Sequence, residues 1–236
     1  MTSNKSCLAF RWFFYLLGLI ILALGITLNT KSSLGVSPII SVSYSVSSIT
    51  NTNFGNITFL WYGIFVLVEI ILHLARRVKN MKEEIIKDLL QIPLCLVFTR
   101  FMNLFSGLIP VFKEAYPDSF IGSPVGRILI LIVAIALTGI GAAMSLNMRI
   151  IPNPGDGIVQ GISDAWGKSV GFTKNCFDAL NISITITISM LVTGHLVGVG
   201  IGTVMAVIGV GRFVALYNYL FKKKTMELSG MSSEVM

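Results

Sequence analysis

Long apolar stretches separated by shorter polar ones form the main pattern of this chain. A helix needs about 20 consecutive, mostly apolar residues to cross a lipid bilayer. Six stretches approach or exceed that length, and they cover residues 10–30, 57–75, 88–110, 126–148, 174–194 and 197–221. The sequence therefore predicts an all-α membrane protein with six transmembrane helices.

Two further stretches, residues 38–50 and 154–167, are helical in character but too short to span a bilayer. Each starts with a proline that follows a polar residue, Ser37 in the first and Asn153 in the second. Ser and Asn are favoured at the helix N-cap, and Pro is favoured at the first helical position. We expect two short helices, which either re-enter the membrane as half-helices or lie at its surface.

The chain also contains a weak internal repeat. A shift of 116 residues aligns two blocks without gaps and places Gly25 on Gly141 and Ser37 on Asn153. Both blocks have the same order of span, short helix, second span and third span. Each unit makes three crossings, an odd number, so the second would be inverted relative to the first. Inverted repeats with broken helices are typical of secondary transporters; the alternative is a chance alignment of similar apolar helices.

The composition supports a membrane location. The chain of 236 residues is 54% apolar and 12% charged, whereas soluble domains carry about 25% charged residues. So low a charge excludes an ordinary cytosolic enzyme and a disordered chain. Three scattered cysteines form no disulfide framework and no metal-ligand spacing, so neither a metal nor a cofactor is expected. Residues 1–236 are predicted to form a single transmembrane domain, with repeat one at about 10–110, repeat two at about 126–221 and a cytoplasmic tail at 222–236.

The distribution of basic residues predicts the orientation. If both short helices return to the side they entered from and the N-terminus is cytoplasmic, the outside segments hold only Lys31, Lys113 and Arg127. The cytoplasmic segments then hold thirteen basic residues: Lys5, Arg11, Arg76, Arg77, Lys79, Lys82, Lys87, Arg149, Lys168, Lys174, Lys222, Lys223 and Lys224. This bias agrees with the positive-inside rule and places both termini in the cytoplasm. It also accounts for the net charge of +7 without nucleic-acid binding.

The starts of the two short helices are the first candidates for binding. A helix N-terminus that points into the membrane offers unpaired N–H groups and a dipole, and both favour an anion. Solute binding is therefore predicted at Ser37, Ser41, Asn153, Gly155 and Asp156. For Asp156 two roles remain open: it caps its own helix, or it contacts a substrate amine or a coupling cation. Neither helix would bind solute if both lay flat on the membrane surface.

Two arginines occur deep in predicted spans. Arg100 and Arg212 lie in matching places of the two repeats, within the similar runs TRFMNLF and GRFVALY. An arginine at the bilayer centre costs at least about 2.5 kcal/mol, so it should face a partner or water. We expect the pair to flank one cavity and bind a carboxylate or phosphate. Asn103 and Tyr217 are expected to line the same space. Pairing with backbone carbonyls or acidic side chains is the structural alternative.

Two acidic residues within spans are predicted to pair charges or to couple an ion. Glu69, in the run FVLVEIILHL, is expected to neutralise Arg100 or, if unpaired, to carry a proton. Asp178 lies close to the cytoplasmic end of its span, where a solvated role is favoured over charge pairing. His73 lies near an interface, and no function is assigned to it.

Three runs of the chain resemble known sequences. LGITLNTKSSLGVSP at 24–38, NPGDGIVQGIS at 153–163 and LVGVGIGTVMAVIGVGRF at 196–213 are similar to the YczE/YyaS/YitT family of bacterial membrane proteins. The resemblance covers most of the chain and implies a bacterial inner-membrane protein with a duplicated core, for which transport is the usual presumption. The chain departs from that pattern at Ile39, where a polar or acidic residue commonly follows the proline, and at Asn103, where an aspartate is frequent.

Together these features predict a secondary transporter that moves a small organic anion by alternating access, with binding near the midplane between the repeats. The expected partners are the lipid bilayer, the solute and a coupling ion, either a proton or sodium; a homodimer is an open alternative. A non-transporting accessory protein that supports a partner complex and a channel are the rival functions. An enzyme is not expected, because the sequence shows no nucleophile–base set or phosphate loop.

Overall fold

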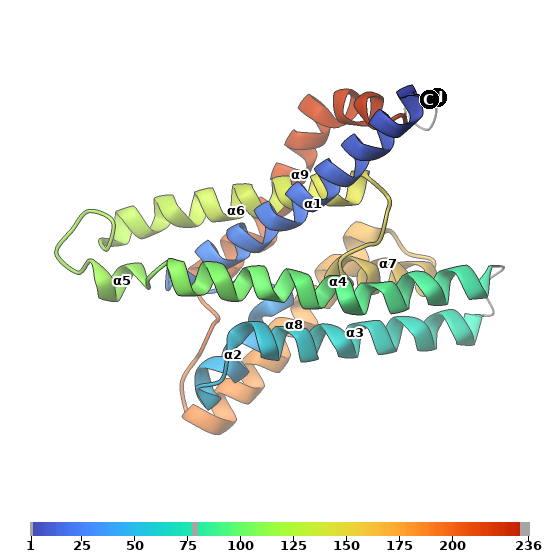
Figure 1. The fold of residues 1–236 in the computed structure, drawn as a ribbon. Coiled ribbons are helices and arrows are strands. Elements are labelled where there is room, and N and C mark those ends of the chain that lie inside the picture. The colour runs from blue at the N-terminus through green and yellow to red at the C-terminus, as the bar shows by residue number, and fades with distance from the viewer. Residues whose placement is uncertain (1, 77–79, 232–236) are drawn as a thin grey trace.

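The computed structural model describes residues 2–76 and 80–231, with side chains from residue 6 onward. Within these residues the chain forms nine helices and no strands (Figure 1). They are α1 (Thr2–Lys31), α2 (Pro38–Thr50), α3 (Phe54–Arg76), α4 (Met81–Leu108), α5 (Phe112–Ala115), α6 (Pro124–Asn147), α7 (Pro154–Trp166), α8 (Val170–Thr193) and α9 (Ile201–Leu228).

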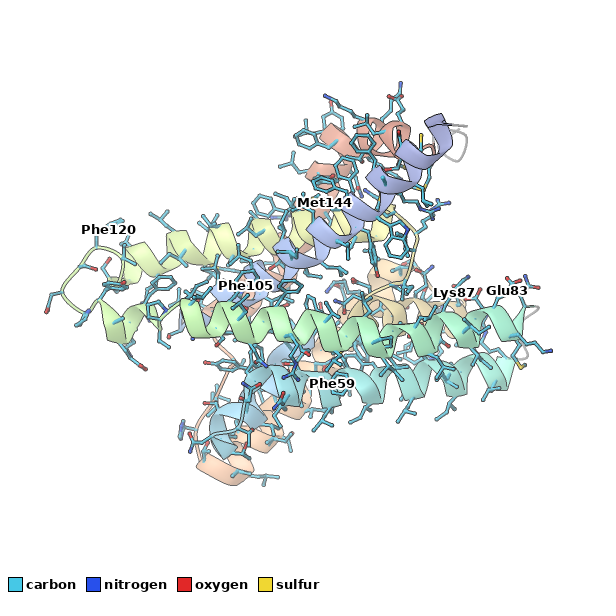
Figure 2. The ribbon with its side chains drawn as sticks, viewed as in Figure 1. Phe59, Glu83, Lys87, Phe105, Phe120 and Met144 are labelled. Carbon is cyan, nitrogen blue, oxygen red and sulfur yellow. The ribbon has the colours of Figure 1, made fainter. Side chains whose placement is uncertain are left out.

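Six of these helices are long and apolar enough to cross a membrane, namely α1, α3, α4, α6, α8 and α9. Their outer faces carry large apolar side chains; Leu60 on α3 is 63% exposed and Leu191 on α8 is 81% exposed. Figure 2 shows side chains projecting outward along the long helices. Lipid suits such a surface better than water does. The predicted all-helical fold with six long apolar helices is confirmed, and these helices indicate a multi-pass membrane protein. The helices α2 and α7 have only 13 residues each.

Glycines bring α1 and α6 into close contact. A Cβ on Gly25 would lie 2.5 Å from the Thr138 nitrogen of α6, and a Cβ on Gly141 would lie 2.4 Å from the Leu22 nitrogen of α1. No other residue type fits at such distances without a shift of the backbone. Close approach at small residues is the usual way in which helices associate in membranes.

The largest apolar core fixes the two short helices among the long ones. Ile40 of α2 and Ile158 of α7 are fully buried in it, together with Tyr62 and Phe65 of α3. Because each short helix contributes to the same core, neither lies as a separate element on the surface of the molecule.

Non-helical linkers precede both α2 and α7. Each contains a residue in the left-handed region, Ser33 with φ of 54° and Arg149 with φ of 47°. Polar groups elsewhere in the protein form hydrogen bonds with the backbone of these linkers. The Val36 N–H donates to a carbonyl in the loop before α9 at 2.9 Å, and the Tyr15 hydroxyl donates to the Ile151 carbonyl at 2.9 Å. The non-helical backbone of both linkers therefore has hydrogen-bond partners within the protein.

Helix boundaries in the first half of the chain recur 116 residues later. Three pairs of helix ends show this spacing: Lys31 and Asn147, Pro38 and Pro154, and Phe54 and Val170. A capping contact recurs with the same spacing. The Ser47 hydroxyl donates to the Thr52 carbonyl, and the Ser163 hydroxyl donates to the Lys168 carbonyl, each at 2.7 Å.

The last helix is longer than the sequence predicts. The expected tail begins at residue 222, but α9 continues to Leu228 and buries Thr225 and Met226. Met226 shares an apolar cluster with Tyr15 of α1. Part of the expected tail is therefore packed against the bundle, because Met226 finds an apolar partner on α1, while Lys223 and Lys224 are exposed.

Candidate functional site

The N-termini of α2 and α7 line one small cavity, which we call the central cavity. Its volume is about 60 Å³. The lining residues come from seven helices and the two linkers: Leu22, Ile26, Ser37, Pro38, Ile39, Tyr62, Thr138, Ala142, Asn153, Gly155, Asp156, Lys174, Ala206 and Val210. The structure thus brings together the starts of two helices that lie 116 residues apart in the sequence.

The two helix starts differ in how their N–H groups are satisfied. The Asn153 side-chain oxygen accepts a hydrogen bond from the Gly155 N–H at 3.2 Å, so α7 is capped by its own side chain. Ser37 makes no such bond at the start of α2. N–H groups at an uncapped helix start remain available to an anion.

Lys174 supplies a positive charge to this cavity. It belongs to α8, and its Nζ lies 2.5 Å from Asp178 Oδ2 one helical turn further on. A second cavity of about 90 Å³ adjoins the first and shares four of its lining residues: Ile39, Gly155, Asp156 and Lys174. Sequence reasoning had assigned Lys174 to a cytoplasmic segment, although its spacing of four residues from Asp178 was a signal for pairing.

The two acidic residues near Lys174 are held in an unusual environment. Burial raises the pKa of Asp156 to about 6; the Lys174 ammonium opposes this shift and the Asp178 carboxylate adds to it. Asp178 is 2% exposed, and its Oδ1 has no hydrogen-bond partner among the described residues. The solvated role considered for Asp178 is therefore wrong. It is a buried partner of Lys174 that keeps one acceptor free.

The two arginines do not meet, which corrects the expectation that they flank one cavity. Arg100 is exposed and donates to the Asn56 side-chain oxygen at 2.8 Å. Arg212 is exposed on α9 and has no hydrogen bond or ion pair with another described residue. Arg100 follows the fully buried Thr99, and successive residues point about 100° apart around a helix. Apolar length places both arginines within spans but does not show on which helix face they lie.

Three other predicted binding residues also lie away from the central cavity. Asn103 accepts a hydrogen bond from the Gly55 N–H at 3.1 Å and so holds the start of α3 against α4. Tyr217 is buried against α6 in a separate apolar cluster. Ser41 is fully buried and its hydroxyl lies 2.7 Å from that of Thr185. Each makes an internal contact instead of facing solute.

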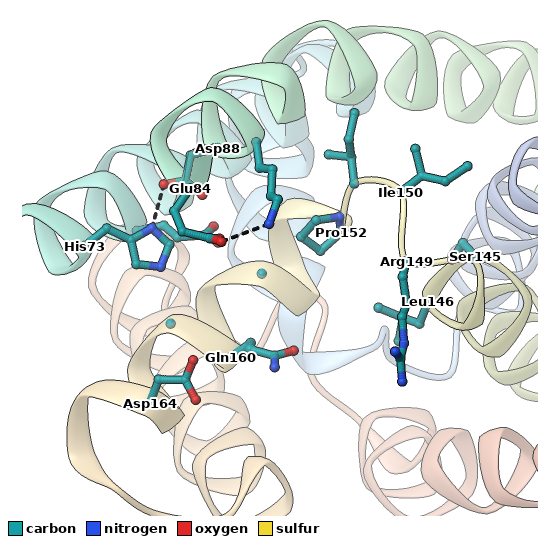
Figure 3. Close-up of a pocket in the computed structure, with 15 residues that line it drawn as sticks. His73, Glu84, Asp88, Ser145, Leu146, Arg149, Ile150, Pro152, Gln160 and Asp164 are labelled. Atoms are coloured by element: carbon teal, nitrogen blue, oxygen red, sulfur yellow. Dashed lines mark hydrogen bonds and ion pairs between the residues drawn. The ribbon is translucent and has the colours of Figure 1, made fainter. Parts of the chain in front are cut away.

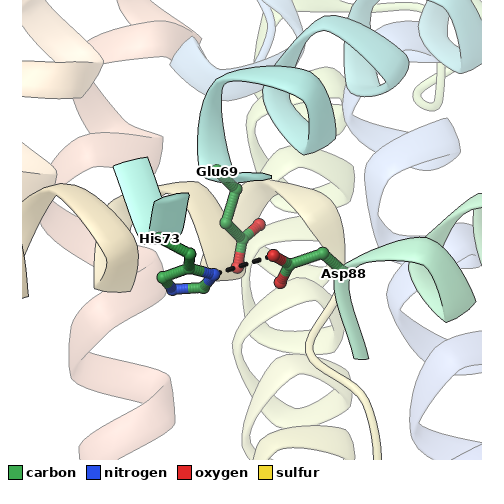
Figure 4. Close-up of side chains that lie close together, drawn as sticks. All are labelled: Glu69, His73 and Asp88. Carbon is green, nitrogen blue, oxygen red and sulfur yellow. Dashed lines mark hydrogen bonds and ion pairs between the residues drawn. The ribbon is translucent and has the colours of Figure 1, made fainter. Parts of the chain in front are cut away.

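Glu69, His73 and Asp88 form a buried polar cluster that the sequence did not reveal. Figure 4 shows the three side chains pointing toward one another. His73 Nδ1 lies 2.7 Å from Asp88 Oδ2, and the Gln91 amide donates to Glu69 Oε2 at 3.0 Å. Glu69 therefore pairs with Gln91 and not with Arg100, and His73 is not incidental. Its spacing of four residues from Glu69 was visible in the sequence, but the approach of α4 was not.

This cluster lines a larger cavity, the α7 vestibule, with a volume of about 340 Å³ (Figure 3). Its other lining residues are Glu84, Lys87, Ser145, Leu146, Arg149, Ile150, Ile151, Pro152, Gly157, Gln160, Gly161 and Asp164. A second large cavity, the α2 vestibule, has a volume of about 530 Å³ and lies beside the linker that precedes α2. It is lined by Thr30, Ser33, Leu34, Gly35, Val36, Tyr44, Ser48 and residues 195–200.

Comparison with known proteins identifies a family. A family model described as "Family of unknown function (DUF6198)" matches residues 9–219, and the chain therefore belongs to that family. No curated protein and no solved structure matches the chain. Any functional conclusion must therefore come from the geometry of the cavities and the side chains around them.

Proposed function

We propose that this membrane protein is a secondary transporter that moves a small organic anion by alternating access through the central cavity. The observation that carries the proposal is the meeting of Ser37, Asn153 and Lys174 around one cavity. Two helix N-termini and one ammonium group there favour a carboxylate or phosphate. The proposed site contains the same two helix starts as the site predicted from the sequence. Its positive charge comes from Lys174 and not from Arg100 and Arg212.

The proposal includes an inverted repeat, with α2 and α7 as re-entrant half-helices. Two contacts between the halves of the chain match each other, and this match supports the inverted repeat. The Arg11 guanidinium donates to the Met148 carbonyl at 2.8 Å. The Arg127 guanidinium donates to the Ser32 carbonyl at 3.4 Å, and both partners of this second contact lie 116 residues from those of the first. A two-fold relation between three-crossing units produces such exchange of identical contacts.

The two vestibules support alternating access. Adding 116 to residue numbers in the α2 vestibule gives lining residues of the α7 vestibule: Thr30 gives Leu146, Ser33 gives Arg149, Leu34 gives Ile150, Gly35 gives Ile151, Val36 gives Pro152, Tyr44 gives Gln160 and Ser48 gives Asp164. The α2 vestibule lies where α1 ends, and the α7 vestibule lies where α3 ends, at opposite ends of the molecule (Figure 1). Each would open the central cavity to one side of the membrane in turn.

Asp156 and Asp178 are the proposed groups for coupling. Both lie beside Lys174, where a proton or sodium ion would change the charge that the solute meets. A proton on Asp156 would leave Lys174 with less negative charge around it and so strengthen anion binding. Glu69, the other predicted coupling residue, lies outside the central cavity, in the α7 vestibule.

The proposed setting is the bacterial inner membrane, with both termini in the cytoplasm. The resemblance to the YczE/YyaS/YitT family and the excess of basic residues on one side support this setting. The α7 vestibule then faces the cytoplasm and the α2 vestibule faces outward.

Ligand-induced stabilisation tests the anion site. Purified protein in detergent would be heated with acetate, succinate, glutamate or inorganic phosphate, because a ligand raises apparent stability by mass action. We expect at least one of these anions to raise the melting temperature of the wild type and of Lys168→Gln, but not of Lys174→Gln. Lys168 is the matched control because it is an exposed lysine six residues earlier in the chain that does not line the central cavity. Equal stabilisation of Lys174→Gln would contradict the site.

Transport is tested separately with the stabilising anion in proteoliposomes. The proposal predicts saturable uptake that Lys174→Gln abolishes and Lys168→Gln retains. Binding without uptake would contradict a transporter and favour an accessory protein, and uptake without saturation would favour a channel.

A further inference from the structure

The cluster of Glu69, His73 and Asp88 has the composition and geometry of a metal site. One ligand atom from each side chain can be chosen so that all three lie within 4.8 Å of one another. α3 supplies Glu69 and His73 from successive turns, and α4 supplies Asp88 from the opposite side (Figure 4). The three residues are 4%, 8% and 2% exposed. Their backbones lie on packed helices, so the ligands are held in place.

The contacts that the described residues make with this cluster bring little positive charge to it. His73 contacts Asp88, the neutral Gln91 amide contacts Glu69, and the Lys87 ammonium, which also lines the vestibule, pairs with Glu84. Two ionised carboxylates in an apolar interior are costly unless a proton or a cation neutralises them. A divalent cation bound between two carboxylates and a neutral imidazole makes the net charge of the site zero.

The matching contact in the other half of the molecule shows that packing does not require this cluster. α7 packs on α3 at Gly157 and Glu69. The residues 116 positions away, Ser41 of α2 and Thr185 of α8, meet through two hydroxyl groups 2.7 Å apart. A neutral pair thus performs the same structural role. The carboxylates are an addition confined to the α7 vestibule.

Gln91 gives an independent indication of a bound cation. The side chain is fully buried, and its Oε1 has no hydrogen-bond partner among the described residues. A Cβ on Gly157 would lie 2.8 and 2.9 Å from the Glu69 oxygens and 3.1 Å from Gln91 Oε1, so these three oxygens lie close together beside Gly157. Glu69 and Gly157 both line the α7 vestibule, whose volume of about 340 Å³ gives an ion access to the Glu69 carboxylate.

We propose that Glu69, His73 and Asp88 bind a divalent first-row transition-metal ion of the Zn²⁺ type. One imidazole with two carboxylates suits such ions, whereas Mg²⁺ and Ca²⁺ prefer oxygen ligands alone and Cu⁺ prefers sulfur. The ion replaces the hydrogen bond between His73 and Asp88, and water from the vestibule completes its coordination. Gln91 positions Glu69 as an outer partner.

Zinc binding to the purified full-length protein tests this inference, and the test does not depend on the transport proposal. Calorimetric titration with Zn²⁺ should give one ion per chain, and Mg²⁺ should not compete. His73→Gln and Asp88→Asn should each weaken Zn²⁺ binding by at least about 100-fold, and Gln91→Ala by about tenfold. Asp164→Asn is the matched control, because Asp164 lines the same vestibule but is exposed and outside the cluster.

Co²⁺ titration adds a spectroscopic check. Co²⁺ held by nitrogen and oxygen ligands absorbs visible light, and this band should disappear in His73→Gln while remaining in Asp164→Asn. Size-exclusion chromatography establishes that each variant is folded. Failure of the folded wild type to bind Zn²⁺ would overturn the inference by itself. Equal Zn²⁺ affinity of wild type, His73→Gln and Asp88→Asn would overturn it as well, since the ion would then lie elsewhere.

Discussion

The hydroxyl groups of Ser41 and Thr185 lie 2.7 Å apart and join α2 to α8, just as Gly157 and Glu69 join α7 to α3 on the other side of the molecule. The two contacts lie 116 residues apart in the sequence and differ in chemistry. One is neutral and hydrogen-bonded, and the other carries a carboxylate. In the inverted repeat that we propose, this difference distinguishes the two vestibules.

The arginines are predicted to be unimportant for solute binding. Arg100 and Arg212 are exposed and line neither the central cavity nor its neighbour. We expect Arg100→Gln and Arg212→Gln to change the affinity for the stabilising anion by no more than about twofold, as for other surface substitutions. Thermal-shift titrations of both variants give this affinity. A loss as large as that caused by Lys174→Gln would show that the arginines reach the solute.

Close packing at Gly141 should make substitution there costly. A Cβ at this position would lie 2.4 Å from the Leu22 nitrogen, a backbone atom that cannot move without shifting α1. Gly141→Ala is expected to destabilise the protein by about 1–3 kcal/mol, the usual cost of overpacking. The melting temperature in detergent measures the effect. Gly211→Ala is the control, because a Cβ there meets nothing within 4 Å; it should be neutral or stabilising. Equal effects of the two substitutions would argue against the close contact.

The raised pKa of Asp156 predicts a pH-dependent stability. Burial holds this pKa at about 6 in the folded protein, above its ordinary value of 3.8. The folded state therefore favours the protonated form, and stability should fall as the pH rises through about 6. The groups that face Asp156 from α8 are Lys174 and Asp178. Melting temperatures between pH 5 and pH 8 should fall less in Asp156→Asn than in the wild type.

The exposed Asp164 provides the control for this measurement. Asp164→Asn should follow the pH dependence of the wild type. A wild type whose melting temperature did not respond between pH 5 and pH 8, or an Asp156→Asn variant that responded equally, would contradict a raised pKa at Asp156.

Elements with strong local signals were predictable from the sequence. Apolar length identified the six long helices, and the polar residue with the following proline placed the starts of α2 and α7 at Pro38 and Pro154. The spacing of 116 residues followed from a few glycines and prolines, and the same spacing recurs in helix ends and caps. These features depend on neighbouring residues along the chain, which a sequence records directly.

Features that depend on helix rotation and on partners from distant segments were not predictable. The sequence places Arg100 within a span but does not show that it lies on the exposed face of α4, where it reaches Asn56. The contact of Asp88 with His73 exists only once α3 and α4 pack together, so the sequence alone does not reveal it. Lys174 was assigned to solvent, although it lines the cavity. Hydrophobicity reports how deep a residue lies in the membrane, whereas tertiary packing decides what it meets.

The sidedness of two introduced cysteines tests the central claim, a pair of oppositely oriented repeats around one cavity, most directly. Ser48 and Asp164 are exposed, line the α2 and α7 vestibules respectively, and lie 116 residues apart. Ser48→Cys and Asp164→Cys would be made in a chain without its three native cysteines and treated with a membrane-impermeant maleimide on intact cells and on inverted vesicles. We predict that Ser48→Cys reacts from outside and Asp164→Cys from the cytoplasmic side. Reaction of both cysteines from the same side would contradict the inverted arrangement, and with it the transport mechanism.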